Sequence, residues 1–131
     1  MNEPGPDDVR PRILVVDDEP RMGKAMERLL ATRYRVTVAL SAPKALDLLA
    51  AEPAFDAIVC DLMMPEMSGM DLYQALSASR ADLAGRMVFM TGGAYTDEAQ
   101  EFLAQVPQRR LDKPFRPEEL ERVLEAVLRG R

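Results

Sequence analysis

Residues 55–69 read FDAIVCDLMMPEMSG. An apolar stretch from Phe55 to Cys60, interrupted only by Asp56, leads directly into Asp61 and then into residues typical of a turn. Such a stretch predicts a buried strand that ends on a carboxylate. Asp61 is therefore either a solvated turn residue or part of a chemical site, and the rest of the chain decides between these interpretations.

The chain on either side alternates between strand-like and helix-like segments. Strands are predicted at Ile13–Val16, Tyr34–Ala39, Ala57–Cys60, Met87–Met90 and Arg110–Asp112. Apolar residues three or four positions apart predict two amphipathic helices, one with Met22, Ala25, Met26, Leu29 and Leu30, the other with Leu120, Val123, Leu124, Val127 and Leu128. Further helices are expected after Ser41, Ser68 and Thr96, whose hydroxyls can cap a helix N-terminus.

Five strand–helix units predict an α/β fold in which one parallel sheet carries helices on both faces. The segments ILVV, AIVC and MVFM are continuously apolar, as expected for strands covered on both sides. By contrast, YRVTV alternates and RRLD is mostly charged, so these two strands belong at the edges. This pattern fits a doubly wound, flavodoxin-like (βα)5 sheet of order 2-1-3-4-5, with its switch point between strands 1 and 3.

Polar side chains follow four of the predicted strands. Asp17 and Asp18 follow strand 1, Asp61 follows strand 3, Thr91 follows strand 4 and Lys113 follows strand 5. In open parallel sheets the ligand crevice lies beyond the carboxyl ends of the strands at the switch point, so these groups should meet there. Clustered carboxylates repel one another unless a cation joins them, and hard oxygen ligands in an open site suit Mg²⁺.

Each of these residues also has a simpler interpretation. Asp18 alone could be the N-cap of a helix that begins near Pro20. Asp61 could belong to a turn, Thr91 could simply be a β-branched residue at the end of a strand, and Lys113 could be a solvated charge. Their placement at the same end of one sheet favours a common site.

Composition excludes several other classes. The chain has 131 residues, which suits one domain, and its net charge of −5 argues against binding to nucleic acid. No apolar run suits membrane insertion and no signal peptide begins the chain, so a cytoplasmic location is expected. The absence of histidine excludes histidine catalysis and a phosphohistidine made on this chain, and Cys60 is expected to be a buried, inert thiol. Residues 1–11 are predicted to be a flexible tail or linker, 12–128 the domain and 129–131 a C-terminal tail.

The chain resembles the receiver domain of two-component response regulators from about Arg12 to Leu128. The resemblance lies in the acidic pair Asp17-Asp18, in DLMMPEMSG with Asp61, in Thr91 after the fourth strand, and in KPF at 113–115. The stretch FMTGGAYTDEAQEFL (89–103) is also similar to receiver segments of hybrid histidine kinases.

The resemblance implies a role for each matched residue. Asp61 would accept a phosphoryl group from a phosphohistidine of a histidine kinase or its phosphotransfer domain. Asp18, Asp61 and the Met63 backbone carbonyl would bind Mg²⁺, with Asp17 acting mainly through water. Lys113, often followed by a cis bond to Pro114 in this family, would pair with a phosphoryl oxygen. Thr91 would donate its hydroxyl to another oxygen and act as a switch.

One position departs from the family pattern. Receivers commonly carry an aromatic residue three positions before the lysine, where this chain has Arg110. We expect Arg110 to stay near the surface, on the side of the fourth main helix, and to pair with Glu98 or Glu101. Output would then use loop movement around residues 91–96.

Several alternatives remain open at this point. The chain could be a stand-alone receiver, a receiver segment of a hybrid histidine kinase that acts as a phosphoryl sink or internal regulator, or a degenerate receiver that only binds a partner. A phosphohydrolase resembling the haloacid dehalogenase group is less favoured, because DDEP replaces Asp-x-Asp, and so is a flavin-binding module. We expect a monomer or weak homodimer, an unknown downstream partner protein, and no multiple-turnover activity on an external substrate.

Overall fold

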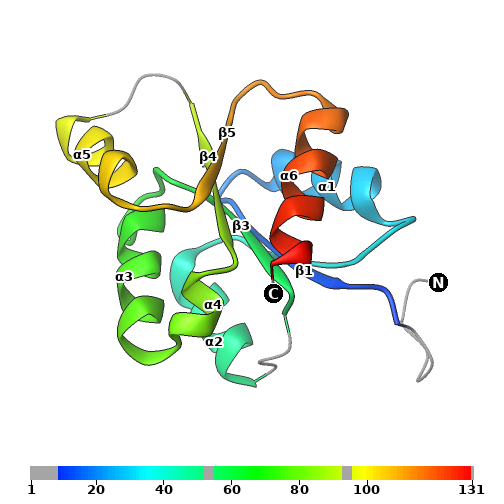
Figure 1. The fold of residues 1–131 in the computed structure, drawn as a ribbon, viewed down its shortest axis with the longest axis horizontal. Helices are drawn as coiled ribbons and strands as arrows, with labels where there is room; N and C mark the ends of the chain where they lie inside the picture. The colour runs from blue at the N-terminus through cyan, green and yellow to red at the C-terminus, as the bar shows by residue number, and fades with distance from the viewer. Residues whose placement is uncertain (1–8, 52–54, 93–95, 131) are drawn as a thin grey trace.

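The computed structural model describes residues 9–51, 55–92 and 96–130 (Figure 1). Most of the predicted tail over 1–11 and the last residue of the predicted C-terminal tail, Arg131, therefore lie outside the described residues. The strands are β1 (Arg12–Val16), β2 (Arg35–Ala39), β3 (Ala57–Asp61), β4 (Met87–Thr91) and β5 (Arg109–Asp112). The helices are α1 (Pro20–Leu30), α2 (Ala42–Ala51), α3 (Gly69–Ser79), α4 (Ala81–Ala84), α5 (Asp97–Gln105) and α6 (Pro117–Arg129).

The five strands form one parallel sheet of order β2-β1-β3-β4-β5, which confirms the predicted doubly wound fold. Four of the five predicted strands gain a residue at one end, and two of the residues gained are predicted site residues. Asp61 and Thr91 are the last residues of β3 and β4, paired with Met90 and Asp112. Both side chains are therefore positioned by the sheet itself and not by a turn.

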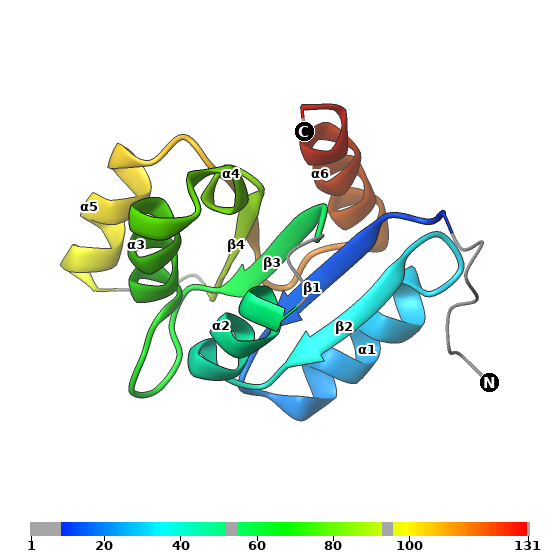
Figure 2. The ribbon, with the colours of Figure 1, turned by 90° about the horizontal axis from the view of Figure 1, so that it is seen from below.

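Helices cover the sheet on both faces, as the two views show (Figures 1 and 2). Helices α1 and α6 pack on one face against Ile13, Val15 and Val59, while α2, α3, α4 and α5 pack on the other against Leu14, Ile58 and Phe89. Alternate residues of a strand point to opposite faces, so each continuously apolar strand supplies both cores. The three central strands are buried as predicted, and β2 and β5 form the edges.

An aromatic cluster joins β4 to two helices on the second face. Tyr73 from α3, Phe89 from β4 and Phe102 from α5 make three edge-to-face contacts, with ring centroids 5.3–5.8 Å apart. Edge-to-face pairs stabilise a fold beyond the burial of their surface. Because Phe89 lies two residues before Thr91, this cluster anchors α5 to the strand that carries the hydroxyl at the site.

The helix N-termini follow the predicted caps, with one correction. Ser68 and Thr96 accept hydrogen bonds from the backbone N–H groups of Asp71 and Ala99. The N-cap of α1 is Glu19, not Asp18, and its carboxylate accepts from the Arg21 N–H. Asp18 lies one residue too early to reach the first turn, which leaves its carboxylate available for another role. The four-residue helix α4 was not predicted, because it contains less than two turns of apolar periodicity.

Candidate functional site

The predicted site residues meet at the carboxyl edge of the sheet. Asp17 and Asp18 directly follow β1, Asp61 and Thr91 end β3 and β4, and Lys113 directly follows β5. Strands β1 and β3 are neighbours although β2 lies between them in sequence, so the acidic residues converge at the switch point. The sheet topology thus brings together five side chains that are separated by up to 96 positions in the sequence.

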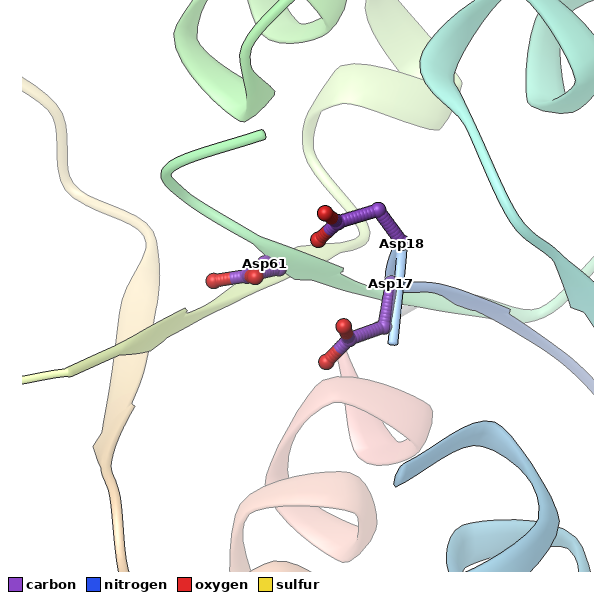
Figure 3. Close-up of side chains that lie close together, drawn as sticks. All are labelled: Asp17, Asp18 and Asp61. Carbon is purple, nitrogen blue, oxygen red and sulfur yellow. The ribbon is translucent and has the colours of Figure 1, made fainter. Parts of the chain in front are cut away.

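The three aspartates form a compact acidic cluster (Figure 3). One carboxylate oxygen from each of Asp17, Asp18 and Asp61 lies within 4.8 Å of the other two. Lys113 is the cation beside them, with Nζ 3.2 Å from Asp17 Oδ2 and 3.6 Å from Asp61 Oδ2. Three carboxylates and one ammonium leave two uncompensated negative charges in these four groups, which favours the binding of a further cation.

Asp17 is the buried member of the cluster and both of its oxygens have partners. Oδ1 accepts from the Glu19 backbone N–H at 2.9 Å, and Oδ2 accepts from Lys113 Nζ. These bonds give both oxygens of the buried carboxylate a partner, since a buried charge without partners would be unstable. With both oxygens engaged, Asp17 is better suited to orient the site than to bind an ion directly, and its role through water stays a prediction.

Asp61 is the candidate nucleophile because its side chain is partly accessible and its surroundings disfavour the charged form of the carboxyl. Its side chain is 13% exposed. Burial raises the pKa of this carboxyl above its usual value, Lys113 lowers it, and the neighbouring charges of Asp17 and Asp18 raise it further. A hydrogen bond from the Met63 backbone also lowers the pKa of Asp61. The net effect is a raised pKa, so the charged form of Asp61 is less stable here than it would be in an exposed aspartate.

The donor set fits a hard divalent cation. Carboxylate oxygens from Asp18 and Asp61 face the same volume, Asp18 is exposed to solvent, and no thiol or imidazole belongs to the cluster. Mg²⁺ prefers a few carboxylate oxygens with water in its remaining positions. The acidic residues therefore match magnesium better than zinc or copper, which prefer nitrogen and sulfur ligands.

Thr91 lies at the same edge but bonds to a residue that the sequence analysis did not single out. Its side chain is buried at 1% exposure, and Oγ1 donates to Asp112 Oδ1 at 2.6 Å. Thr91 and Asp112 are register partners on β4 and β5, and the Lys113 backbone N–H donates to the Thr91 carbonyl at 2.7 Å. Knowledge of the register would have identified Asp112, because paired residues of parallel strands point to the same face.

Arg110 is exposed, as expected, and borders a shallow pocket with Gln100, Leu103 and Ala104 of α5. The expected ion pair with Glu98 or Glu101 is wrong: within the ranges that the structure describes, Arg110 makes no ion pair with either residue. The reason is helical phase. Residues 100, 103 and 104 form the stripe of α5 nearest Arg110, whereas 98 and 101 belong to the adjacent stripe.

The remaining predictions near the site concern Cys60, the Lys113–Pro114 bond and the loop after Thr91. Cys60 is fully buried, and burial raises the pKa of its thiol above the usual range, as expected for an inert thiol. The Lys113–Pro114 peptide bond is cis, in agreement with the resemblance. The proposed output loop falls partly outside the described residues, because residues 93–95 are not among them. Among the helices that are described, none is long and apolar enough to cross a membrane.

Comparisons with known proteins find relatives of this chain in both sequence and fold. The family model for the response regulator receiver domain matches residues 13–125. The two-component response regulator ORR11 of Oryza sativa subsp. indica is 31% identical over 90% of this chain and 81% of its own length. The sensor histidine kinase TmoS of Ectopseudomonas mendocina is 35% identical over 85% of this chain, which spans only 11% of that protein. The solved structure of the Vibrio cholerae chemotaxis protein CheY4 is 28% identical, covers 92% of this chain and 100% of its own, and has a TM-score of 0.78.

Proposed function

The chain belongs to the response regulator receiver domain family, and from this premise we propose that it receives a phosphoryl group on Asp61 and relays a signal by changing shape. The observation that carries the proposal is the position of Lys113, whose ammonium lies 3.2 Å from Asp17 and 3.6 Å from Asp61 beside a three-carboxylate cluster. An ammonium in this place can pair with an incoming phosphoryl oxygen while Asp61 attacks phosphorus. We place the domain at residues 12–128.

In the proposed reaction an oxygen of the Asp61 carboxylate attacks the phosphorus of a phosphohistidine on a partner protein. The new O–P bond forms as the N–P bond breaks, and the imidazole leaves with the electron pair of that bond. The Lys113 ammonium exchanges its contact with Asp61 for one with a phosphoryl oxygen. Partial exposure of Asp61 leaves room for this approach. The raised pKa of its carboxyl makes the carboxylate oxygen more basic than that of an exposed aspartate, which favours attack on phosphorus.

The donor set supports a magnesium requirement for this step. Asp18 and Asp61 would hold the ion directly, together with the Met63 backbone carbonyl, and Asp17 would act through water. When bound, the ion would neutralise the crowded oxygens and thereby permit the approach of a phosphoryl dianion. Asp17 would keep Lys113 aimed at the site in the meantime, since its Oδ2 accepts a hydrogen bond from the ammonium.

The partner that supplies the phosphoryl group is a histidine kinase or its phosphotransfer domain, in the cytoplasm. An apolar groove lined by Met22, Leu29, Pro114 and Phe115 lies directly beside Lys113. A helical partner resting in this groove could present its phosphohistidine to Asp61. Signal output would follow from contacts with a downstream protein, after the Thr91 hydroxyl has turned towards the new phosphoryl group.

A second candidate arrangement is a receiver segment of a hybrid histidine kinase. The similarity to the sensor histidine kinase TmoS, which extends over 85% of this chain, favours this arrangement. In that setting the domain would act as an internal regulator or as a sink for phosphoryl groups from its own kinase. The chemistry at Asp61 would be the same in both arrangements, so one experiment tests the site in either.

The experiment is phosphorylation of the purified chain by acetyl phosphate with Mg²⁺, followed by peptide mass spectrometry. One phosphoryl group should appear at Asp61. Asp61→Asn should lose it, because an amide is not a nucleophile of this kind, whereas Asp47→Asn, at an exposed position on α2, is the matched control and should keep it. Equal labelling of Asp61→Asn and the control would overturn the assignment. Multiple turnover on a small phosphate ester, in a separate assay, would instead indicate a phosphohydrolase.

A further inference from the structure

The hydrogen bond between Thr91 and Asp112 has properties that the proposed function does not explain. Its length of 2.6 Å falls in the range of hydroxyl donors to an anionic oxygen, which are about 2.5–2.7 Å long and roughly twice as strong as neutral bonds. Thr91 is 1% exposed, while Asp112 is an exposed residue at the rim of the site. The strong acceptor of this hydroxyl is therefore a solvent-accessible carboxylate on the neighbouring strand.

A threonine hydroxyl has one proton to donate. While that proton is bonded to Asp112, it cannot also be donated to an oxygen at Asp61. The two acceptors lie on opposite sides of Thr91, because β4 is flanked by β3, which carries Asp61, and by β5, which carries Asp112. The hydroxyl therefore has two alternative positions, and the structure shows the one directed at β5.

We propose that Asp112 is a positioning residue that latches the Thr91 hydroxyl away from the phosphoacceptor site in the unmodified protein. This inference rests on the proposed function, because it requires that a phosphoryl group on Asp61 attracts the same hydroxyl. Phosphorylation then breaks one charge-assisted hydrogen bond and forms another. The latch biases the chain towards its unmodified conformation, and the bias equals the net strength of the Thr91–Asp112 bond.

Two features make this latch reversible. Asp112 is exposed, so its carboxylate is hydrated as soon as the hydroxyl leaves, and no buried charge is left unpaired. The backbone bond from the Lys113 N–H to the Thr91 carbonyl lies at the same strand ends and does not involve the hydroxyl. Lys113 therefore keeps its place near Asp61 whichever way the hydroxyl points, and only the side chain of Thr91 must turn.

The latch also supplies a two-position element in a chain that lacks the usual aromatic residue. Arg110 and Asp112 are both exposed, and because they are two positions apart they lie on the same face of β5. An arginine cannot follow the threonine into a buried position as an aromatic ring can, because losing the hydration of its guanidinium is unfavourable. Asp112 instead gives the threonine a defined resting partner, so that the state of the site remains linked to β5.

The test is the affinity of the chain for beryllofluoride, a phosphoryl mimic, measured with Mg²⁺ by isothermal titration calorimetry. Asp112→Ala should bind about ten- to a hundredfold more tightly than the wild-type chain, because a hydrogen bond to a charged group no longer competes. Asp112→Asn keeps an oxygen acceptor without the charge and should lie between the two. In a Thr91→Val background, Asp112→Ala should change the affinity little, since the latch is already absent.

The outcomes separate the latch from other effects. Equal affinities of the wild-type chain and Asp112→Ala would overturn the latch and leave the proposed function standing. The same gain in affinity in the Thr91→Val background would also overturn it, because general charge repulsion would then account for the effect. If the wild-type chain bound no beryllofluoride, the proposed function itself would fail, and the latch with it. NMR coupling constants of Thr91 should show one side-chain rotamer in the wild-type chain and averaging in Asp112→Ala.

Discussion

Replacing Gly69 by alanine should destabilise the protein through the backbone that carries Asp61. Gly69 is the first residue of α3 and is buried against the end of β3, where its N–H donates to the Leu62 carbonyl at 2.9 Å. A Cβ on this residue would lie 2.5 Å from the Asp61 carbonyl oxygen and 3.0 Å from the Leu62 Cα. Both are main-chain atoms, so no side-chain rotation relieves the clash.

The expected loss of stability follows from these contacts. The carbonyl oxygen must move by about 0.9 Å to reach the 3.4 Å at which ordinary contact begins. Overpacking of this kind costs about 1–3 kcal/mol, and weakening the Gly69–Leu62 hydrogen bond adds about 1 kcal/mol. Alanine recovers roughly 0.4–1 kcal/mol by restricting the unfolded chain. The net effect should be a decrease of about 2 kcal/mol in the free energy of unfolding.

Urea denaturation followed by circular dichroism measures this loss. With a slope of about 1.5 kcal/mol/M, the midpoint should fall by roughly 1.3 M. Gly85→Ala is the matched control, because its Cβ would meet its nearest neighbours at 3.6 Å and its φ of −67° suits alanine. That variant should stay within about 0.5 kcal/mol of the wild-type chain. Equal stabilities of the two variants would refute the close approach of α3 to the Asp61 backbone.

Three further predictions concern the metal, the pH dependence and the aromatic cluster. Mg²⁺ at ten times its dissociation constant should stabilise the chain by about 1.4 kcal/mol, which corresponds to an increase of roughly 5 °C in Tm. Asp18→Ala should lose this increase in thermal melts. Because the pKa of Asp61 is raised in the folded state, its contribution to stability is present at low pH and is lost as the pH rises through that pKa. With a chelator present, Asp61→Asn should therefore melt at a higher temperature than the wild-type chain at pH 7, and an unchanged or lower Tm would contradict this reasoning. Phe102→Leu should lower the free energy of unfolding by about 1 kcal/mol, because both edge-to-face contacts of that ring, with Tyr73 and Phe89, are lost; chemical denaturation with no loss would show that these contacts contribute little.

The sheet order and the gathering of the acidic residues could be predicted from the sequence because both follow from burial. Strands covered on two faces must be apolar throughout, which distinguished β1, β3 and β4 from the edges. Parallel strands end at a common edge, so Asp17 and Asp61 had to lie together once the order was known. Each of these predictions depends on the residue types within one strand or directly after it, and a single sequence shows these residue types.

Features that depend on a pair of residues could not be predicted in the same way. The bond between Thr91 and Asp112 requires the register of β4 against β5, which no pattern within either strand reveals. The assumed partners of Arg110 failed for a similar reason, because the rotation of α5 about its axis decides which of its residues face β5. Assigning Glu19 and not Asp18 as the cap of α1 depends on a shift of one residue, which composition does not resolve.

The charged edge strand has a consequence for how the chain behaves at high concentration. Strand β5 is four residues long, lies at the rim of the sheet and presents Arg109 and Arg110 to solvent. An open edge of parallel sheet can pair with a strand from another molecule, and this is a common first step of aggregation. In an in-register parallel pairing, Arg109 and Arg110 would each face the guanidinium group of the same residue in a second copy, and this repulsion opposes the pairing. The residue that departs from the family pattern at position 110 therefore also opposes the in-register pairing of two sheet edges.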